Sequence, residues 1–131
     1  MSSSKLAIIL AGAVAVGASA TAFAGARNTY TLDVSVSGHY AVGSFGSTRN
    51  SANTGEYAQC IQVVSSSLNY GFCQFRDAQN EFGVCYTTDP ARLEVLRGMP
   101  EDAQFYVTWN ASSGQCDYVQ ITNSSLTEPK Q

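Results

Sequence analysis

Charged side chains are scarce in this chain of 131 residues, where they make up 13% of the total. That share is about half the usual one in soluble proteins. The sequence has no run of Lys or Arg, and its ten acidic and seven basic side chains give a net charge of -3. Without a basic patch, nucleic acid and anionic lipid surfaces are poor candidate partners. The apolar content of 44% is ordinary, which argues against a disordered chain.

The residues and motifs that commonly carry catalysis are also scarce. The only histidine is His39, in a glycine-rich stretch, and no Gly-x-Ser-x-Gly elbow occurs. The nearest carboxylate pairs are Asp77 with Glu81 and Glu101 with Asp102, both in expected turns, where acidic residues are common. The first of these turns offers oxygen ligands for calcium but lacks the spacing and the glycine of an EF-hand. We therefore expect no enzyme, no cofactor and no metal site, and a hydrolase using His39 is the least favoured interpretation.

The longest apolar run lies within residues 1–24 and is shorter than the roughly 20 residues that a membrane span needs. It follows Lys5, extends from Leu6 to Ala18 and precedes small residues that end at Ala24, in the order of a secretory signal. Its richness in Ala and Gly is typical of bacteria. We expect cleavage after Ala24, or two residues later after Ala26. The remaining residues, 25–131, suffice for one domain with one core, placed in the periplasm or outside the cell.

Four cysteines, an even number, indicate two disulfides in an exported domain of this size. The alternative is a zinc site with four thiolate ligands. Successive cysteines are separated by 12, 11 and 30 residues, so no Cys-x-x-Cys pair is present to start a metal site. The four residues are Cys60, Cys73, Cys85 and Cys116.

Alternation of apolar and polar residues predicts that the mature chain is mainly β-strand. Thr29–Ser37 alternates clearly, whereas glycines weaken a second strand over Tyr40–Phe45. The polar, turn-rich segment Ser44–Glu56 is expected to be a long loop. Further strands are expected at Tyr57–Val64, Asn69–Arg76, Phe82–Thr87, Ala103–Trp109 and Gln115–Thr122, the last two as a closing hairpin.

One short helix is expected at about residues 90–97, before the closing hairpin. Asp89 is a good N-cap, Pro90 suits the first helical position, and Gly98 can end the helix. The polar tail, residues 123–131, is expected to be loose. The predicted fold class is therefore mainly β: a small antiparallel sheet or sandwich with one short helix and two disulfides.

Strand pairing places the cysteines relative to one another. A register with Cys60 opposite Cys73, and Cys73 opposite Cys85, puts three cysteines in one row across three strands. The same register aligns apolar residues, Phe72 among them, on the other face, which we assign to the core. In the closing hairpin, a register with Thr108 opposite Cys116 likewise places Cys116 on the face away from the core.

Cys73 thus has two candidate partners. Either Cys60–Cys73 and Cys85–Cys116 form, or Cys73–Cys85 and Cys60–Cys116 form. The third pairing would have to skip a strand, and cysteines that far apart cannot be bridged. Both remaining pairings tie the closing hairpin to the central strands, and the sequence does not choose between them.

Aromatic residues are abundant, with seven Tyr, six Phe and one Trp. Phe72, Phe105 and Trp109 are expected in the core. A row of tyrosines on a polar sheet face suits stacking on sugars or a flat protein interface. Tyrosines whose parity points them outward, or places them near an edge, form a candidate binding surface: Tyr57, Tyr106 and Tyr118.

Several short segments carry a resemblance to known proteins: Gln59-Cys60, Tyr70 to Cys73, Cys85, Phe105 to Trp109, Gly114 to Cys116, and the Pro129-Lys130 ending. In these segments, residues 57–130 resemble a group of short exported bacterial proteins of uncharacterised role. The resemblance implies secretion and a disulfide-bonded sheet. It implies no activity.

The sequence therefore favours a non-enzymatic exported protein, structural or surface-associated, that acts by binding or self-assembly. Its partner would be a second copy, paired through exposed strand edges, or an extracellular protein or glycan. The alternative is a small secreted binding module, such as an enzyme inhibitor or a glycan binder, with the Ser44–Glu56 loop as its contact surface. Neither nucleic acid nor, once the leader is removed, a membrane is an expected partner.

Overall fold

The computed structural model describes residues 31–124. The expected leader, residues 29 and 30 of the first expected strand and residues 125–131 of the tail lie outside this range. In chain order the elements are β1 (Ser35–Ser37), β2 (Tyr40–Ser44), α1 (Phe45–Asn50), β3 (Tyr57–Val64), β4 (Asn69–Arg76), β5 (Phe82–Thr87), α2 (Pro90–Arg97), β6 (Gln104–Trp109) and β7 (Cys116–Thr122).

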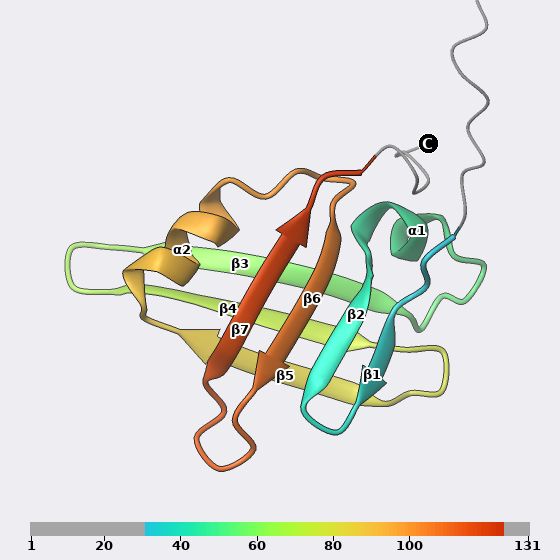
Figure 1. Cartoon of the computed structure of the whole chain (residues 1–131), viewed down its shortest axis with the longest axis horizontal. Helices are drawn as coiled ribbons and strands as arrows, with labels where there is room; N and C mark the ends of the chain where they lie inside the picture. Colours follow the sequence, from blue (N-terminus) through green and yellow to red (C-terminus); the bar gives the residue numbers. More distant parts are fainter. Residues whose placement is uncertain (1–30, 125–131) are drawn as a thin grey trace, which may run out of the picture.

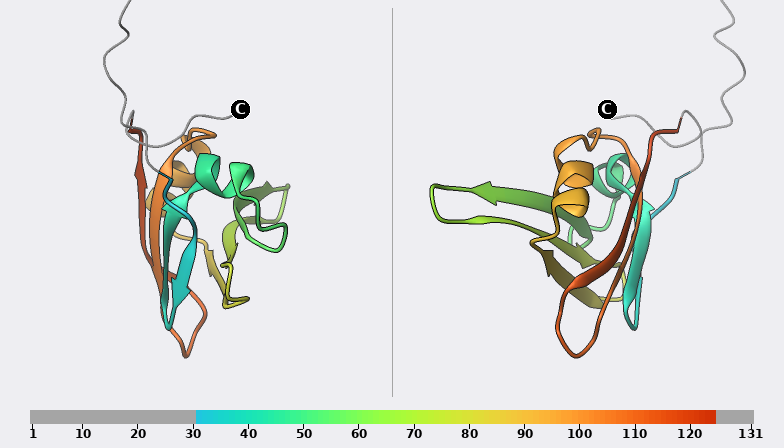
Figure 2. Two further views of the ribbon diagram at one scale, coloured as in Figure 1. Left: turned by 90° about the vertical axis from the view of Figure 1, so that its right-hand side faces the viewer. Right: turned by 60° about the vertical axis from the view of Figure 1, so that its left-hand side comes forward.

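The strands form two antiparallel sheets. One has four strands in the order β1-β2-β6-β7, and the other has three in the order β3-β4-β5. The strands of the two sheets cross each other, and the β3–β4 hairpin extends beyond the body of the molecule (Figure 1 and Figure 2). Crossed packing is one of the two ways in which sheets form a sandwich. The predicted mainly β fold class is confirmed.

The sequence locates the three central strands and their registers correctly. β3, β4 and β5 have the expected bounds, with Cys60 opposite Cys73 and Cys73 opposite Cys85. The closing hairpin is also confirmed, each of its strands beginning one residue later than expected. β1 is shorter than the expected strand, because only Ser35–Ser37 pairs with β2.

The expected faces of the three-stranded sheet are wrong. Cys73 and Cys85 are buried and point into the core, whereas Phe72 lies on the outer face and is only partly buried. Phe75, on the same face as Cys73, takes the place in the core that was expected for Phe72. Both faces of this sheet carry apolar side chains, so alternation alone could not distinguish them.

Steric fit decides which face is buried. The inner face carries glycines where other elements approach closely: a Cβ on Gly83 would lie 2.8 Å from Cζ2 of Trp109. A Cβ on Gly71 would lie 2.6 Å from Cδ1 of Leu96 in α2. Because this face carries small residues, a bulky side chain of the opposite sheet and the apolar side of a helix can pack closely against it. The larger side chains of the other face would prevent such close packing.

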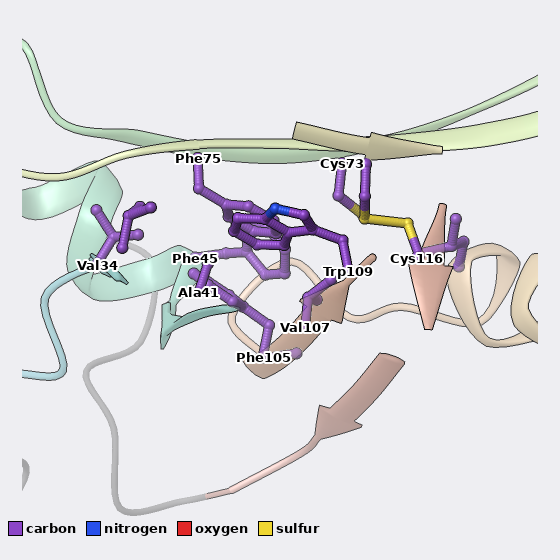
Figure 3. Packing of buried hydrophobic residues seen from close by; sticks show 13 residues of the cluster. Val34, Ala41, Phe45, Cys73, Phe75, Phe105, Val107, Trp109 and Cys116 are labelled. Carbon is purple, nitrogen blue, oxygen red and sulfur yellow. A yellow bond between two sulfur atoms is a disulfide. The ribbon is translucent and has the colours of Figure 1, made fainter. Parts of the chain in front are cut away.

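Four aromatic rings fill the space between the sheets (Figure 3). Phe75 of β4 stacks on Phe105 of β6 with ring centroids 4.9 Å apart. It also lies nearly parallel to the indole of Trp109, at 6.4 Å. Phe45, the first residue of α1, also packs against Phe105, with the two ring centroids 4.8 Å apart.

The disulfides are Cys60–Cys73 and Cys85–Cys116, the first of the two pairings left open above. Cys60–Cys73 joins neighbouring strands of one sheet, with Cα atoms 4.0 Å apart. Cys85–Cys116 joins β5 to β7, and so one sheet to the other, across a sequence separation of 31. Such a bridge stabilises the fold mainly by restricting the unfolded chain.

The position expected for Cys116, on the face away from the core, is wrong. A β-bulge between Thr108 and Trp109 shifts the register of the closing hairpin, so that Trp109 pairs with Cys116. One extra residue in a strand reverses the face of the residues beyond it. Cys116 therefore enters the core beside Trp109. The expected core face of the remaining hairpin is confirmed, but the expected register is wrong by two residues, because Thr108 lies opposite Tyr118 and Phe105 opposite Ile121.

The helix expected before the closing hairpin is confirmed as α2. The Asp89 carboxylate accepts a hydrogen bond from the backbone N–H of Arg92 (2.9 Å), and Pro90 occupies the first turn. The helix ends at Gly98, as expected. Leu93 and Leu96 are its buried residues.

Residues 45–50 form a second helix, α1, where a loop was expected. Ser44 caps it by accepting a hydrogen bond from the N–H of Ser47 (3.3 Å), and the Thr48 hydroxyl donates to the Ser44 carbonyl (2.7 Å). Gly46 and Asn50 are poor helix formers. The helix forms because Phe45 is buried against Phe105, a tertiary contact that overrides local propensity.

Gly83→Ala should lower the free energy of unfolding by about 2 kcal/mol, because the methyl group meets the rigid, buried indole of Trp109. Gly71→Ala is the matched control. It meets the flexible ends of Leu93 and Leu96 and should cost less than about 1 kcal/mol. Urea unfolding measures both, and equal losses would contradict the account of the sheet packing.

Candidate functional site

His39 lies in the exposed turn between β1 and β2, next to Gly38, whose φ is +55°. Its backbone carbonyl accepts a hydrogen bond from the N–H of Trp109 (2.9 Å). Within residues 31–124 its imidazole makes no hydrogen bond. His39 thus contributes to the fold through its backbone.

The carboxylate pair Glu101 and Asp102 lies in the turn before β6. Arg49, in the last turn of α1, contacts both residues: it donates to the Glu101 carbonyl (3.3 Å) and lies 3.5 Å from the Asp102 carboxylate. Both side chains of the ion pair are about two-fifths exposed. Exposed pairs of this kind contribute little to stability. The pair attaches α1 to the opposite loop.

Asp77, considered above as a calcium ligand, is a buried structural residue. Its Oδ1 accepts hydrogen bonds from the N–H groups of Gln79 and Glu81, each 2.9 Å, and closes the β4–β5 turn. Its Oδ2 accepts from the N–H of Val36 in β1 (3.2 Å). The carboxylate is therefore already engaged with three backbone donors.

Glu56 performs the same role two residues earlier in the chain, at Val34, directly before β1. It is buried, and its carboxylate accepts from the N–H of Val34 (2.7 Å) and from the hydroxyl of Ser51 (2.6 Å). β1 is an edge strand, and unpaired backbone groups at an edge invite pairing with other chains. Glu56 and Asp77, from the ends of β3 and β4, occupy two of those donors, so this edge is closed by the other sheet.

The expected contact loop, Ser44–Glu56, is largely structural. Residues 45–48 are buried, and the Ser47 hydroxyl accepts a hydrogen bond from the N–H of Leu32 (3.0 Å). A hollow of about 230 Å³ lies between α1 and the start of β3. Tyr57 lines it together with Arg49 and Glu56. Tyr57 is therefore separated from the other two tyrosines of the expected binding surface, which belong to the opposite sheet.

Tyr106 and Tyr118 do lie together, on the outer face of the four-stranded sheet. Their ring centroids are 6.0 Å apart. Tyr40 of β2, which was not singled out in the sequence, lies 6.0 Å from Tyr106 on its other side. The three rings, 39% to 50% exposed, form a row that we call the tyrosine face. Its third member could not be found from parity alone because β2 and β6 are distant in sequence.

The outer face of the three-stranded sheet is apolar over most of its area. Ile61, Phe72 and Tyr86 lie side by side across its three strands. Val84 and Phe82 continue the exposed row along β5. We call these five residues the apolar face. Four of them, all except Phe72, are 39% to 53% exposed.

Polar groups on the outside of this sheet are few and paired. Gln59 and Gln74 lie opposite each other, and their amides form a hydrogen bond of 2.7 Å. Arg76 donates to the side chain of Asn80 (2.8 Å). Tyr70 stacks on Phe72 with centroids 6.4 Å apart, which extends the aromatic surface toward the projecting hairpin. Large exposed apolar patches of this kind mark interaction surfaces on proteins.

The part of the chain that the structure describes contains no cluster of three His, Cys, Asp or Glu side chains suited to a metal ion. None of the helices between residues 31 and 124 is long and apolar enough to cross a membrane. The two disulfides are compatible with an extracellular location. Comparison with protein-family models, curated proteins and solved structures finds no match to this chain.

Asp77→Asn should lower the free energy of unfolding by about 1 to 2 kcal/mol, because an amide N–H₂ then faces the N–H of Val36. Asp77→Ala, which removes all three acceptor contacts, should cost about 3 kcal/mol. Glu81→Gln, an exposed change in the same turn, is the control and should stay within about 0.5 kcal/mol. Urea unfolding decides, and an Asp77→Asn variant as stable as the control would refute the edge-closing role.

Proposed function

We propose that this protein is a non-enzymatic exported protein that self-associates through the apolar face of its three-stranded sheet. The observation that carries the proposal is the exposure of Ile61, Phe82, Val84 and Tyr86 on one continuous surface. Burial of apolar area contributes roughly 25 cal/mol per Å², so covering four large side chains favours association strongly.

A second copy is the partner that suits this face best. The surface is a sheet, so a second copy can stack on it face to face at about 10 Å, as sheets do in a sandwich. It carries one charged side chain, Arg76 at its end, which donates a hydrogen bond to Asn80, so the interface depends on apolar contacts rather than on an oppositely charged partner. A face that matches itself forms a twofold interface, the commonest kind in homo-oligomers.

The projecting β3–β4 hairpin supports the same proposal. Val64 and Leu68 near its tip are more than half exposed, with relative exposures of 66% and 54%. The hairpin reaches past the helices and the other sheet (Figure 2). Apolar residues on such an arm can contact a neighbouring copy and extend the interface beyond the sheet.

Export to an oxidising compartment is the other half of the proposal. The core contains three buried, disulfide-bonded cysteines, Cys73, Cys85 and Cys116. The Cys85–Cys116 disulfide joins the two sheets. Disulfides of this kind form in the periplasm or outside the cell and are rare in the cytosol. The signal expected over residues 1–24 supplies the route.

The oxidised protein should associate as its concentration rises, and Ile61→Thr/Val84→Thr should weaken that association at least about tenfold, because both changes replace exposed apolar groups by polar ones. Threonine retains the β-branched shape that strands favour. Sedimentation velocity over a concentration series measures the effect.

Val95→Ala is the control for this experiment, since Val95 is a similarly exposed apolar residue, on α2. It should leave association unchanged, and thermal unfolding should show that all three proteins are folded alike. Self-association is wrong if the wild type stays monomeric up to millimolar concentration, or if the double variant associates as the wild type does.

Intact mass spectrometry of the protein recovered from an exporting bacterium should show a chain that begins after Ala24, or after Ala26. The mass should be lower than that of the reduced chain by the four hydrogen atoms that two disulfides remove. Reduction and alkylation of the same sample provides the control. An uncleaved leader or four alkylatable thiols before reduction would contradict export.

A further inference from the structure

The tyrosine face and the apolar face lie on opposite sides of the molecule, because each is the outer face of one of the two sheets; the four-stranded sheet is the nearer one in Figure 1. The outward side chains beside its three rings are small or polar and carry no charge: Ser35, Ser37, Val42, Gln104, Thr108, Gln120 and Thr122. An uncharged surface with a row of exposed aromatic rings, tilted by 31° and 66° from one ring to the next, disfavours ionic ligands and suits a neutral, extended one.

The rings are held in place by their neighbours. The Tyr118 hydroxyl donates to the side-chain oxygen of Gln120 (2.9 Å), whose amide donates in turn to the Thr122 hydroxyl (3.2 Å). Tyr106 lies between Tyr40 and Tyr118 at 6.0 Å from each. A ring that is already oriented loses little conformational freedom when a ligand stacks on it.

The row of rings ends at a hollow of about 270 Å³ between α2 and β7. Tyr118 forms one wall, and Val95 and Val119 contribute apolar surface. The polar lining consists of Asp89, Arg92 and Asp117. The hollow and the tyrosine face are therefore one continuous surface that shares Tyr118.

The charged groups of the hollow are arranged around Arg92. Its guanidinium donates to the backbone carbonyl of Asp117 (2.7 Å) and lies 3.7 Å from the Asp89 carboxylate. These contacts fix the guanidinium and leave some of its five N–H donors for a ligand. Within residues 31–124 the Asp117 carboxylate makes no hydrogen bond, so it can accept hydrogen bonds from the hydroxyl groups of a ligand.

From this arrangement we propose that the tyrosine face and the hollow together bind a neutral polysaccharide. One sugar ring occupies the hollow, with its C–H groups on the Tyr118 ring and its hydroxyls on Arg92 and Asp117. The following sugars lie over Tyr106 and Tyr40. The negative face of an aromatic ring attracts polarised C–H groups, and carboxylate and guanidinium groups satisfy the hydroxyl donors and acceptors.

The charges argue for a neutral chain rather than an acidic one. Two carboxylates, Asp89 and Asp117, face the hollow with one guanidinium, so that its net charge is negative. A uronic acid or a phosphate would be repelled there. This inference concerns a different face from the self-association proposed above, so each can fail without the other.

Affinity electrophoresis in native gels tests the proposal, with amylopectin, a soluble β-glucan and a mannan as neutral probes and polygalacturonate as the acidic one. At least one neutral polymer should retard the oxidised wild-type protein, and polygalacturonate should not. Tyr118→Ala should weaken that retardation at least about tenfold, and Asp117→Asn severalfold. Tyr118→Phe, which keeps the ring, should stay within about threefold of the wild type.

Tyr57→Ala is the control, the same change at a tyrosine of β3 that belongs to neither the tyrosine face nor the apolar face. It should leave retardation unchanged, and unfolding temperatures should show that the variants are folded. The proposal is overturned if no neutral polymer retards the wild type, if polygalacturonate retards it equally, or if Tyr57→Ala causes the same loss. Loss of self-association by Tyr118→Ala without any change in retardation would identify this face as an interface between copies instead, and would also overturn it.

Discussion

The contact between Trp109 and the inner face of the three-stranded sheet determines how the two sheets of this protein fit together. The indole packs over Gly83 and lies parallel to Phe75, and the Cys85–Cys116 disulfide crosslinks the same two sheets beside it. A small core cannot supply much stabilisation by itself, so a covalent link between its two layers has a large relative effect. Because this junction lies on one side of the three-stranded sheet, the other side of that sheet remains exposed.

The two outer faces of the sandwich differ in chemistry because the sheets differ in composition. The three-stranded sheet has apolar residues on both sides, and only one side can be buried against its partner, so Ile61, Val84 and Tyr86 stay exposed. The four-stranded sheet has polar residues and tyrosines on its outside. The protein thus presents one apolar outer face and one polar outer face that carries tyrosines, and we propose a different partner for each.

The two edges of the four-stranded sheet, β1 and β7, also differ: buried carboxylates close the first, and a hollow borders the second. At β1 and the residue before it, the buried carboxylates of Glu56 and Asp77 accept hydrogen bonds from the backbone, so these acidic residues serve the fold. At β7, the opposite edge, Arg92 donates to the Asp117 carbonyl and pairs with Asp89, and a hollow lies beside it. Burial and bonding partners, rather than residue type, distinguish a structural acid from one that is available to a ligand.

The sequence by itself determined the local elements. Alternation and turn residues gave β3, β4 and β5 with their registers, Asp89-Pro90 gave the start of α2, and cysteine parity reduced the disulfide pairings to two. The tertiary structure alone decided which face of the three-stranded sheet is buried, which pairing forms, and that Tyr40 joins Tyr106 and Tyr118. Each of these depends on contacts between segments distant in the chain: Trp109 over Gly83, Cys116 turned inward by a bulge, and the pairing of β2 with β6. Periodicity reports the two sides of a strand but not which of them a distant segment will cover.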